Sequence, residues 1–300
     1  MTAIASPSAE PAAIRHYENF PVASWLCPPR LRAPVAAIYH FARTADDIAD
    51  EGCAAPGERL ALLADYRRDL HAVAGGRAHS DRWPGVFGPL AVQLRAFDLP
   101  VQLLDDLLSA FMQDVVKTRD GAGYADMPQL LDYCRRSANP IGRLLLHLYG
   151  VDSEQALREG DAICTALQLI NFWQDLSVDI PRRRYYLPLA DCAAHGLPVG
   201  ADLAFDFTRL QDDPRAAKLL AHLAAHARAI MQTGAPLVRR VPGRAGWELR
   251  LMVQGGLRVL DKIAALGQAV LRQRPALTRA DAPLLLWRAL VMPLAPGQPS

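Results

Sequence analysis

The sequence predicts an all-α fold, because apolar residues recur at helical spacing along most of its 300 residues. It shows no convincing alternation of the kind that predicts β-strands and no glycine-rich phosphate loop. A repeat of about 20 to 50 residues is also missing from it. Helices are expected at 30–50, 57–74, 84–97, 100–118, 127–149, 153–180, 213–233, 244–273 and 279–291.

Boundary residues support several of these helices in order. Proline stands at a favourable early position in two of them, at Pro100 and Pro128. Gly150 ends the fifth helix, and an Asp-Ser pair followed by Glu begins the sixth. Arg288 and prolines interrupt the apolar stretch 279–291. We expect this stretch to pack as the last helix, and contact with lipid is the alternative.

Composition narrows the class of protein. A hydrophobic content of 51% can bury a large core, and a formal charge of +2 gives no reason to expect a nucleic-acid partner. The five cysteines form no C-x-x-C pair, which argues against a disulfide framework or a zinc site and favours a reducing, cytoplasmic location. Neither a secretory signal nor a run of about 18 apolar residues is present.

The expected organisation is one domain over residues 16–292. A disordered lead is expected at 1–15 and a frayed tail at 293–300.

A polar stripe runs through the apolar stretch ICTALQLINFWQDLSVDIPRRRYYLP, residues 163–188. Its members are three, four and four residues apart, which places them on one face of a helix. They are Gln168, Asn171, Asp175 and Asp179. Such a stripe faces either water or a polar cavity inside the protein.

A second stripe lies in VAAIYHFARTADDIADEG, residues 35–52, and consists of Tyr39, Arg43, Asp46 and Asp50. Each stripe therefore carries two carboxylates one helical turn apart, which repel each other. Carboxylates near a helix C-terminus also oppose the helix dipole. Hydration of an exposed helix end is one way to offset this cost. Binding of hard divalent cations is the other.

Magnesium prefers oxygen ligands and is typically bound by a few carboxylates together with substrate phosphates. Two facing helices with carboxylates could hold Mg²⁺ ions and a diphosphate between them. Arg43 precedes Asp46 by one turn, and residues 182–184 are arginines that follow Asp179, so guanidinium groups are placed to bind phosphate oxygens. Aromatic residues that could line an apolar cavity beyond the metals are Tyr39, Trp173, Tyr185 and Tyr186. This pattern predicts ionisation of a diphosphate ester to a carbocation.

The segments ARTADDIADE, YCRRSANPIGRLLLHLYG and QLINFWQDLSVD together resemble the squalene/phytoene synthase family, over about residues 16–275. The resemblance implies a class I isoprenoid synthase fold with a central cavity and Mg²⁺-assisted departure of diphosphate. It implies metal ligation by five residues: Asp46, Asp50, Asn171, Asp175 and Asp179. It implies diphosphate or substrate contacts for Tyr39, Arg43, Gln168, Gln174, Arg184 and Tyr185. Asp114 matches a further acidic position near the site, and an exposed helix aspartate is the alternative.

Two departures from the family pattern bear on the substrate. Phytoene and dehydrosqualene synthases usually carry Arg directly before the first Asp of the second motif, where this chain has Gln174. In HYENFPVAS, Glu18 stands where those enzymes carry a cationic stretch that grips diphosphate. The sequence therefore resembles the hydroxysqualene synthase branch of bacterial hopanoid pathways. That branch ionises presqualene diphosphate and captures the cation with water, and Gln168, Asn171 and Gln174 are candidates to orient this water.

Three alternatives remain at the level of sequence. The first is a synthase that condenses two prenyl diphosphates to squalene, dehydrosqualene or phytoene. The second is a class I terpene cyclase, and the third a non-catalytic helical binding protein. The implied substrate is a lipid, so the resemblance also suggests peripheral membrane contact and hand-off from the enzyme that makes presqualene diphosphate.

Overall fold

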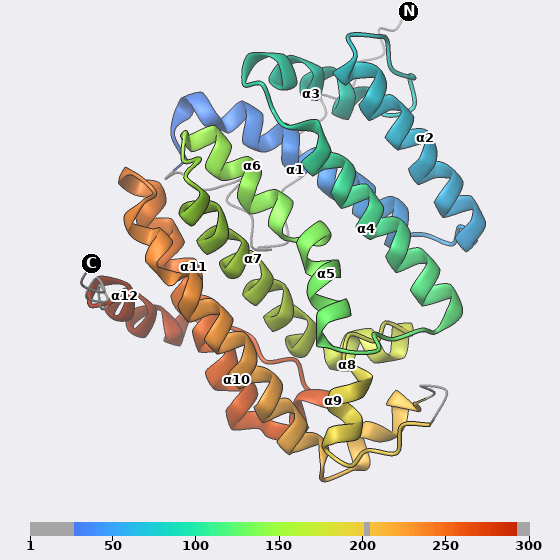
Figure 1. The fold of residues 1–300 in the computed structure, drawn as a ribbon, viewed down its shortest axis with the longest axis vertical. Coiled ribbons are helices and arrows are strands. Elements are labelled where there is room, and N and C mark those ends of the chain that lie inside the picture. The colour runs from blue at the N-terminus through green and yellow to red at the C-terminus, as the bar shows by residue number, and fades with distance from the viewer. Residues whose placement is uncertain (1–26, 201–204, 293–300) are drawn as a thin grey trace, which may run out of the picture.

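The computed structural model describes residues 27–200 and 205–292, and every regular element in these ranges is helical. The predicted lead at 1–15, the tail at 293–300 and the segment around Glu18 lie outside the described residues. The all-α prediction is confirmed (Figure 1). The α-helices are α1 (Pro29–Asp50), α2 (Pro56–Ala74), α3 (Pro84–Ala96), α4 (Val101–Asp120), α5 (Met127–Ser137), α6 (Asn139–Tyr149), α7 (Glu154–Gln174), α8 (Leu176–Asp179), α9 (Leu189–Ala194), α10 (Ala216–Gly234), α11 (Gly243–Leu266) and α12 (Ala282–Leu290).

Three expected helices are divided in the structure. The stretch 127–149 breaks at Ala138 because Pro140, at the start of α6, has no N–H to continue the helix. The stretch 153–180 leaves helical geometry at Asp175, which has φ −100° and ψ 11°. The stretch 244–273 ends at Leu266, because Gly267 adopts φ 51° before a short 3₁₀ turn. The short helix α9 was not predicted.

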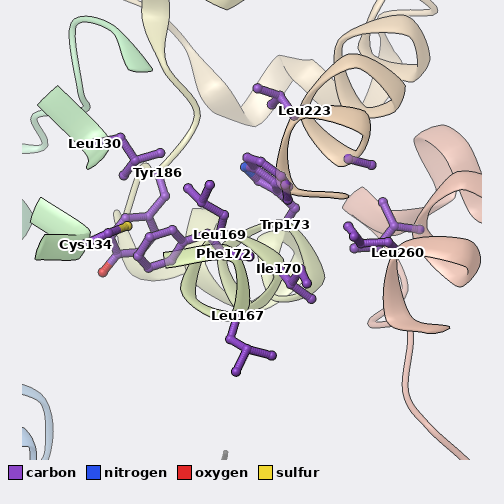
Figure 2. Close-up of a cluster of buried hydrophobic side chains, with 14 of the residues drawn as sticks. Leu130, Cys134, Leu167, Leu169, Ile170, Phe172, Trp173, Tyr186, Leu223 and Leu260 are labelled. Carbon is purple, nitrogen blue, oxygen red and sulfur yellow. The ribbon is translucent and has the colours of Figure 1, made fainter. Parts of the chain in front are cut away.

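Two hydrophobic clusters form the core. Helices α1, α2 and α3 contribute to the first cluster, together with residues of α4 and α6. Helices α5, α7, α10 and α11 contribute to the second, which Figure 2 shows around Phe172 and Trp173 of α7. Helix α4 contributes to both, with Leu107 in the first cluster and Ala110 in the second. The two predicted acidic motifs, on α1 and at the end of α7 and on α8, therefore adjoin different clusters, and α4 contributes to both clusters.

Helix α7 is packed most closely against α10. The approach depends on Gly234, because a Cβ atom there would lie 2.6 Å from the carbonyl oxygen of Glu159 and 2.8 Å from the amide nitrogen of Ile163. One side of α7 is therefore packed against α10, and the polar stripe lies on the opposite side of α7. Among the helices that the structure describes, none is both long and apolar enough to cross a membrane.

Candidate active site

The first acidic motif occupies the last two turns of α1. The apolar side of these turns is anchored in the core, since Phe41 and Ala45 are fully buried. On the polar side, Arg43 bonds to Asp46 (Nη1–Oδ2, 3.2 Å) and to Asp47 (Nη2–Oδ1, 2.8 Å). Tyr39 lies half-buried one turn earlier. The carboxylates are thus presented at the end of α1 with a guanidinium group already beside them.

The second motif occupies the end of α7 and the short helix α8. Its stripe members Gln168, Asn171, Asp175 and Asp179 are all half-buried, whereas their apolar neighbours on α7 are buried. The predicted division of α7 into an apolar and a polar face is therefore confirmed. Asp175 ends α7 and is held by Arg274, which bonds to it through Nε and through Nη2 (Nη2–Oδ2, 3.2 Å). This ion pair accompanies the break in the helix.

The two motifs come together across α4. Arg184, which follows α8, forms an ion pair with Asp50 at the end of α1. Asp114 on α4 lies within electrostatic reach of both Asp46 and Asp179. Two groups of carboxylates that are far apart in the sequence therefore share one region, and Asp114 lies between them.

The charges of this region are incompletely neutralised. Burial raises the pKa of Asp114 to about 7, and the charges of Asp46 and Asp179 add to the rise. The hydroxyl of Tyr133, which bonds to Asp114, and the Lys117 ammonium act in the opposite direction. Burial likewise raises the pKa of Asp179 to about 7, with the charge of Asp175 as the second cause. Additional positive charge at this point would therefore be bound favourably.

A small pocket of about 10 Å³, room for about one water molecule, lies beside Asp114. Its wall combines anionic, cationic and aromatic groups from α4, the following loop and the segment after α8: Asp114, Lys117, Thr118, Ala122, Tyr124, Arg183, Arg184, Tyr185 and Tyr186. Arg183 has φ 61°, a conformation that non-glycine residues rarely adopt. Tyr185 stacks on Phe207 with ring centroids 4.3 Å apart. The strained turn thus places consecutive arginine and tyrosine side chains at the pocket.

Residues 14–281 match the family model described as squalene/phytoene synthase. The chain belongs to the squalene/phytoene synthase family. A hydroxysqualene synthase of Sinorhizobium fredii is 35% identical over 89% of this chain and 84% of its own length. A second hydroxysqualene synthase, from Zymomonas mobilis, is 40% identical over 61% of this chain and 59% of its own length.

Solved structures agree with the fold of the family. The crystal structure of squalene synthase HpnC from Alicyclobacillus acidocaldarius is similar with a TM-score of 0.73 and 32% identity, over 84% of this chain and 90% of that one. A dehydrosqualene synthase in complex with ligand also gives a TM-score of 0.73, at 20% identity over 89% of this chain and 88% of that one. The class I isoprenoid synthase fold that the family resemblance implied is confirmed.

The donor atoms of the site suit magnesium, on which enzymes of the squalene/phytoene synthase family typically depend. Carboxylate oxygens and the amide oxygen of Asn171 are hard ligands of the kind that Mg²⁺ prefers. Within the part of the chain that the structure describes, no three His, Cys, Asp or Glu side chains are already grouped around one cation position. Several carboxylates are bonded to arginine instead, as in the pairs Asp50–Arg184 and Asp175–Arg274. Binding of a cation would require these arginines to release the carboxylates.

Two residues expected at the site point elsewhere. Gln174 is 8% exposed, and its Nε2 donates a hydrogen bond to the carbonyl oxygen of Pro275 at 2.6 Å. Trp173 is fully buried in the second cluster and lies near Leu223 and Leu260 (Figure 2). Its position in the core makes the prediction of a cavity-lining tryptophan wrong, because at the end of α7 the apolar face carries the indole away from the stripe.

Sequence reasoning missed three residues of this site: Lys117, Tyr133 and Arg274. Tyr133 lies at the start of the quoted segment YCRRSANPIG, so the resemblance marked its surroundings but gave it no role. Lys117 follows Asp114 by three residues and could have been found by helical spacing. Arg274 stands 99 residues beyond Asp175, and no local signal connects the two.

Proposed function

We propose that the chain is a Mg²⁺-dependent hydroxysqualene synthase, which ionises presqualene diphosphate and captures the rearranged cation with water. The observation that carries this proposal is the convergence of Asp46, Asp114 and Asp179 with arginines around one region. Because the carboxylates repel an anion, such a region binds a polyanion only together with divalent cations. Divalent cations and arginines together stabilise a departing diphosphate. The similarity to hydroxysqualene synthases over most of the chain supports the choice of substrate.

The reaction balances without a redox partner. The carbon–oxygen bond to diphosphate breaks and its electron pair leaves with the diphosphate. The oxygen of a water molecule then bonds to the rearranged carbocation and gives up a proton. Presqualene diphosphate and water thus become hydroxysqualene and diphosphate, and no hydride donor is consumed.

The chain's own residues divide into three roles in this proposal. Five oxygen donors would hold Mg²⁺: Asp46, Asp50, Asn171, Asp175 and Asp179. Bound Mg²⁺ would neutralise the charge that develops on the leaving diphosphate. Arg43 and Arg184 already form ion pairs with Asp46 and Asp50. In this proposal their N–H groups donate hydrogen bonds to phosphate oxygens when diphosphate is bound. Tyr39, Gln168 and Tyr185 are proposed to contact the substrate.

Water positioning falls to the half-buried face of α7 in this proposal. Gln168 and Asn171 lie on the stripe with Asp175, and their amide groups can accept and donate hydrogen bonds. Gln174 already donates a hydrogen bond to Pro275. Gln168 and Asn171 are therefore the better-placed candidates to orient the attacking water.

The second candidate is a synthase that condenses two prenyl diphosphates. A specific observation favours keeping it: a phytoene synthase of Mycobacterium tuberculosis is 30% identical over 76% of this chain and 71% of its own length. Such an enzyme shares the two acidic motifs but must hold two diphosphates.

Product analysis separates the two candidates. The purified protein is given presqualene diphosphate or farnesyl diphosphate, each with Mg²⁺ in ¹⁸O-labelled water, and the products are identified by mass spectrometry. A C30 alcohol that carries ¹⁸O and forms only from presqualene diphosphate is the expected result. A hydrocarbon formed from farnesyl diphosphate would overturn the proposal in favour of the condensing synthase. Supply of presqualene diphosphate by a partner enzyme, and a cytoplasmic location with peripheral membrane contact, belong to the same proposal.

A further inference from the structure

Helix α12 turns its apolar side chains away from the protein. Leu286, Trp287 and Leu290 are 55%, 62% and 61% exposed, and with Pro283 they follow the spacing of a single helical stripe. Of the nine residues of α12, all of which the structure describes, Ala289 alone is buried. An apolar stripe of this width normally faces the core, and a contiguous apolar patch on the surface marks a contact with another apolar phase.

The orientation of α12 is fixed by polar contacts with α11. Arg288 bonds to Asp261 (Nη1–Oδ2, 2.9 Å), and Arg250 donates to the carbonyl oxygen of Ala289 at 3.4 Å. At the other end Asp281 closes a capping box with Thr278. Helix α12 lies at the outer edge of the molecule beside α11 (Figure 1). These polar contacts with α11 therefore orient α12 so that its apolar stripe faces outward.

The patch continues onto α11. Trp247 is 45% exposed, and the guanidinium group of Arg250 lies 5.0 Å from the centre of its ring. Because Arg250 also bonds to α12, Trp247 and the stripe lie on neighbouring parts of the surface. We name Trp247, Leu286, Trp287, Leu290 and Val291 the α12 patch; all five are exposed.

Charge around the patch is positive. Between residues 272 and 292 the chain carries four arginines and one acidic residue, Asp281. Asp281 is 4% exposed and is paired with Arg258 (Nε–Oδ1, 2.8 Å) and Lys262 (Nζ–Oδ2, 2.6 Å). Three of the four arginines pair with carboxylates from elsewhere in the chain: Arg272 with Asp212, Arg274 with Asp175 and Arg288 with Asp261. Because Asp261 is also bonded by Arg228, and Asp281 by two cations, four cations share the two carboxylates next to α12. An apolar stripe with tryptophans and flanking arginines matches a bilayer with anionic headgroups.

We propose that the α12 patch docks the protein on the surface of an anionic lipid bilayer. Helix α12 has nine residues, about 14 Å of helix, which is too short to span a bilayer of about 30 Å. It therefore lies in the interface, with Trp287 and Leu290 below the headgroups. The segment that leads into α12 carries Arg274, the partner of Asp175, so docking would hold the acidic site close to its lipid source. Docking does not depend on the proposed reaction, and its test needs no turnover.

The test is vesicle binding by the full-length protein. The probe is vesicles of phosphatidylcholine with about 30 mol% phosphatidylglycerol, with pure phosphatidylcholine as reference, and binding is measured by co-sedimentation. The double variant Trp287→Ser/Leu290→Ser is expected to partition about a hundredfold more weakly. Trp287→Phe, which keeps an aromatic side chain, should bind nearly as wild type. Val92→Ser on α3, where Val92 is 59% exposed, is the matched control and should bind unchanged.

Each other occupant of the patch predicts a different result. Vesicle binding that is unaffected by the double variant overturns the proposal. If the wild type is then a dimer in size-exclusion chromatography and the variant a monomer, the patch is covered by a second copy of the chain. If instead the variant exposes residues 1–26 to proteolysis, the patch is covered by that segment. Loss of vesicle binding in a variant with unchanged circular dichroism and unchanged oligomeric state supports docking on lipid.

Discussion

Replacing Asp114 with Asn is expected to stabilise the metal-free protein above neutral pH. The pKa of Asp114 rises from 3.8 to about 7, because of burial and the charges of Asp46 and Asp179. Between those two pH values the native chain binds more protons at this group than the unfolded chain does. The contribution of Asp114 to the free energy of unfolding therefore falls as pH rises through this window.

The magnitude follows from the size of the shift. A rise from 3.8 to about 7 is about three pH units, and each unit corresponds to about 1.4 kcal/mol. The charged Asp114 thus lowers the free energy of unfolding by at most about 4 kcal/mol. Asparagine has nearly the same shape and still accepts a hydrogen bond from Tyr133. We expect Asp114→Asn to raise the free energy of unfolding by about 2–4 kcal/mol at about pH 8 and to leave it almost unchanged at about pH 4.

The assay is urea unfolding in EDTA, followed by circular dichroism at both pH values. Asp132→Asn on α5 is the matched control, because the hydrogen bond from Arg135 lowers the pKa of this exposed carboxyl, and its loss should not stabilise the protein at high pH. Mg²⁺ at about pH 8 should raise the stability of the wild type and shrink the advantage of Asp114→Asn. A difference between Asp114→Asn and wild type that does not change with pH would refute the reasoning.

Three further predictions test other parts of the molecule. Asp46→Asn is expected to lower turnover by at least about a hundredfold at unchanged helical content, because it removes an oxygen donor from the proposed cation site; wild-type turnover in the product assay would contradict the assignment. Gln168→Ala should raise the share of alkene among the products, because Gln168 is a candidate to orient the attacking water. Gln174→Ala should instead lower the free energy of unfolding by about 1–3 kcal/mol, because it removes a buried hydrogen bond. Mass spectrometry and urea unfolding measure these two effects, and an unchanged alcohol-to-alkene ratio in both variants would exclude both glutamines from water positioning. Gly234→Ala should lower the free energy of unfolding by about 3 kcal/mol, because the added Cβ meets the backbone of α7. Gly57→Ala, with open space around it, is the control and should be neutral or slightly stabilising. Equal unfolding midpoints of the two variants would disprove the close contact of α7 and α10.

Periodicity was sufficient to predict which faces of α7 are apolar and polar. The apolar neighbours of Asn171 and Asp175 specify which face of α7 is buried, and the structure confirms that division. Repulsion between carboxylates one turn apart predicted that each acidic motif is either hydrated or bound to divalent cations. The structure pairs one carboxylate of each motif with an arginine, Asp46 with Arg43 and Asp175 with Arg274.

Contacts between distant segments were beyond the reach of local patterns. The spacing of Asp175 and Asp179 predicted one continuous helix. In the structure α7 ends at Asp175, where Arg274, distant in the sequence, binds the carboxylate. Asp114 gave an equally ambiguous signal, because an aspartate on an amphipathic helix is usually exposed. Only the folded structure shows that it lies within electrostatic reach of both acidic motifs, through Asp46 and Asp179.

Gln174 shows how a departure from a family pattern can be explained by packing. The side chain is buried, and its partner is the carbonyl oxygen of Pro275. An arginine at this position would have to bury a guanidinium group against one carbonyl oxygen, next to the cationic Arg274. A neutral amide avoids both costs and still donates the hydrogen bond. The positive charge beside the first aspartate of the motif is then supplied by Arg274, from the segment that also positions α12. Position 174 and position 274 therefore form one structural unit, and exchange of Gln174 for Arg alone should destabilise the protein unless Arg274 is replaced as well.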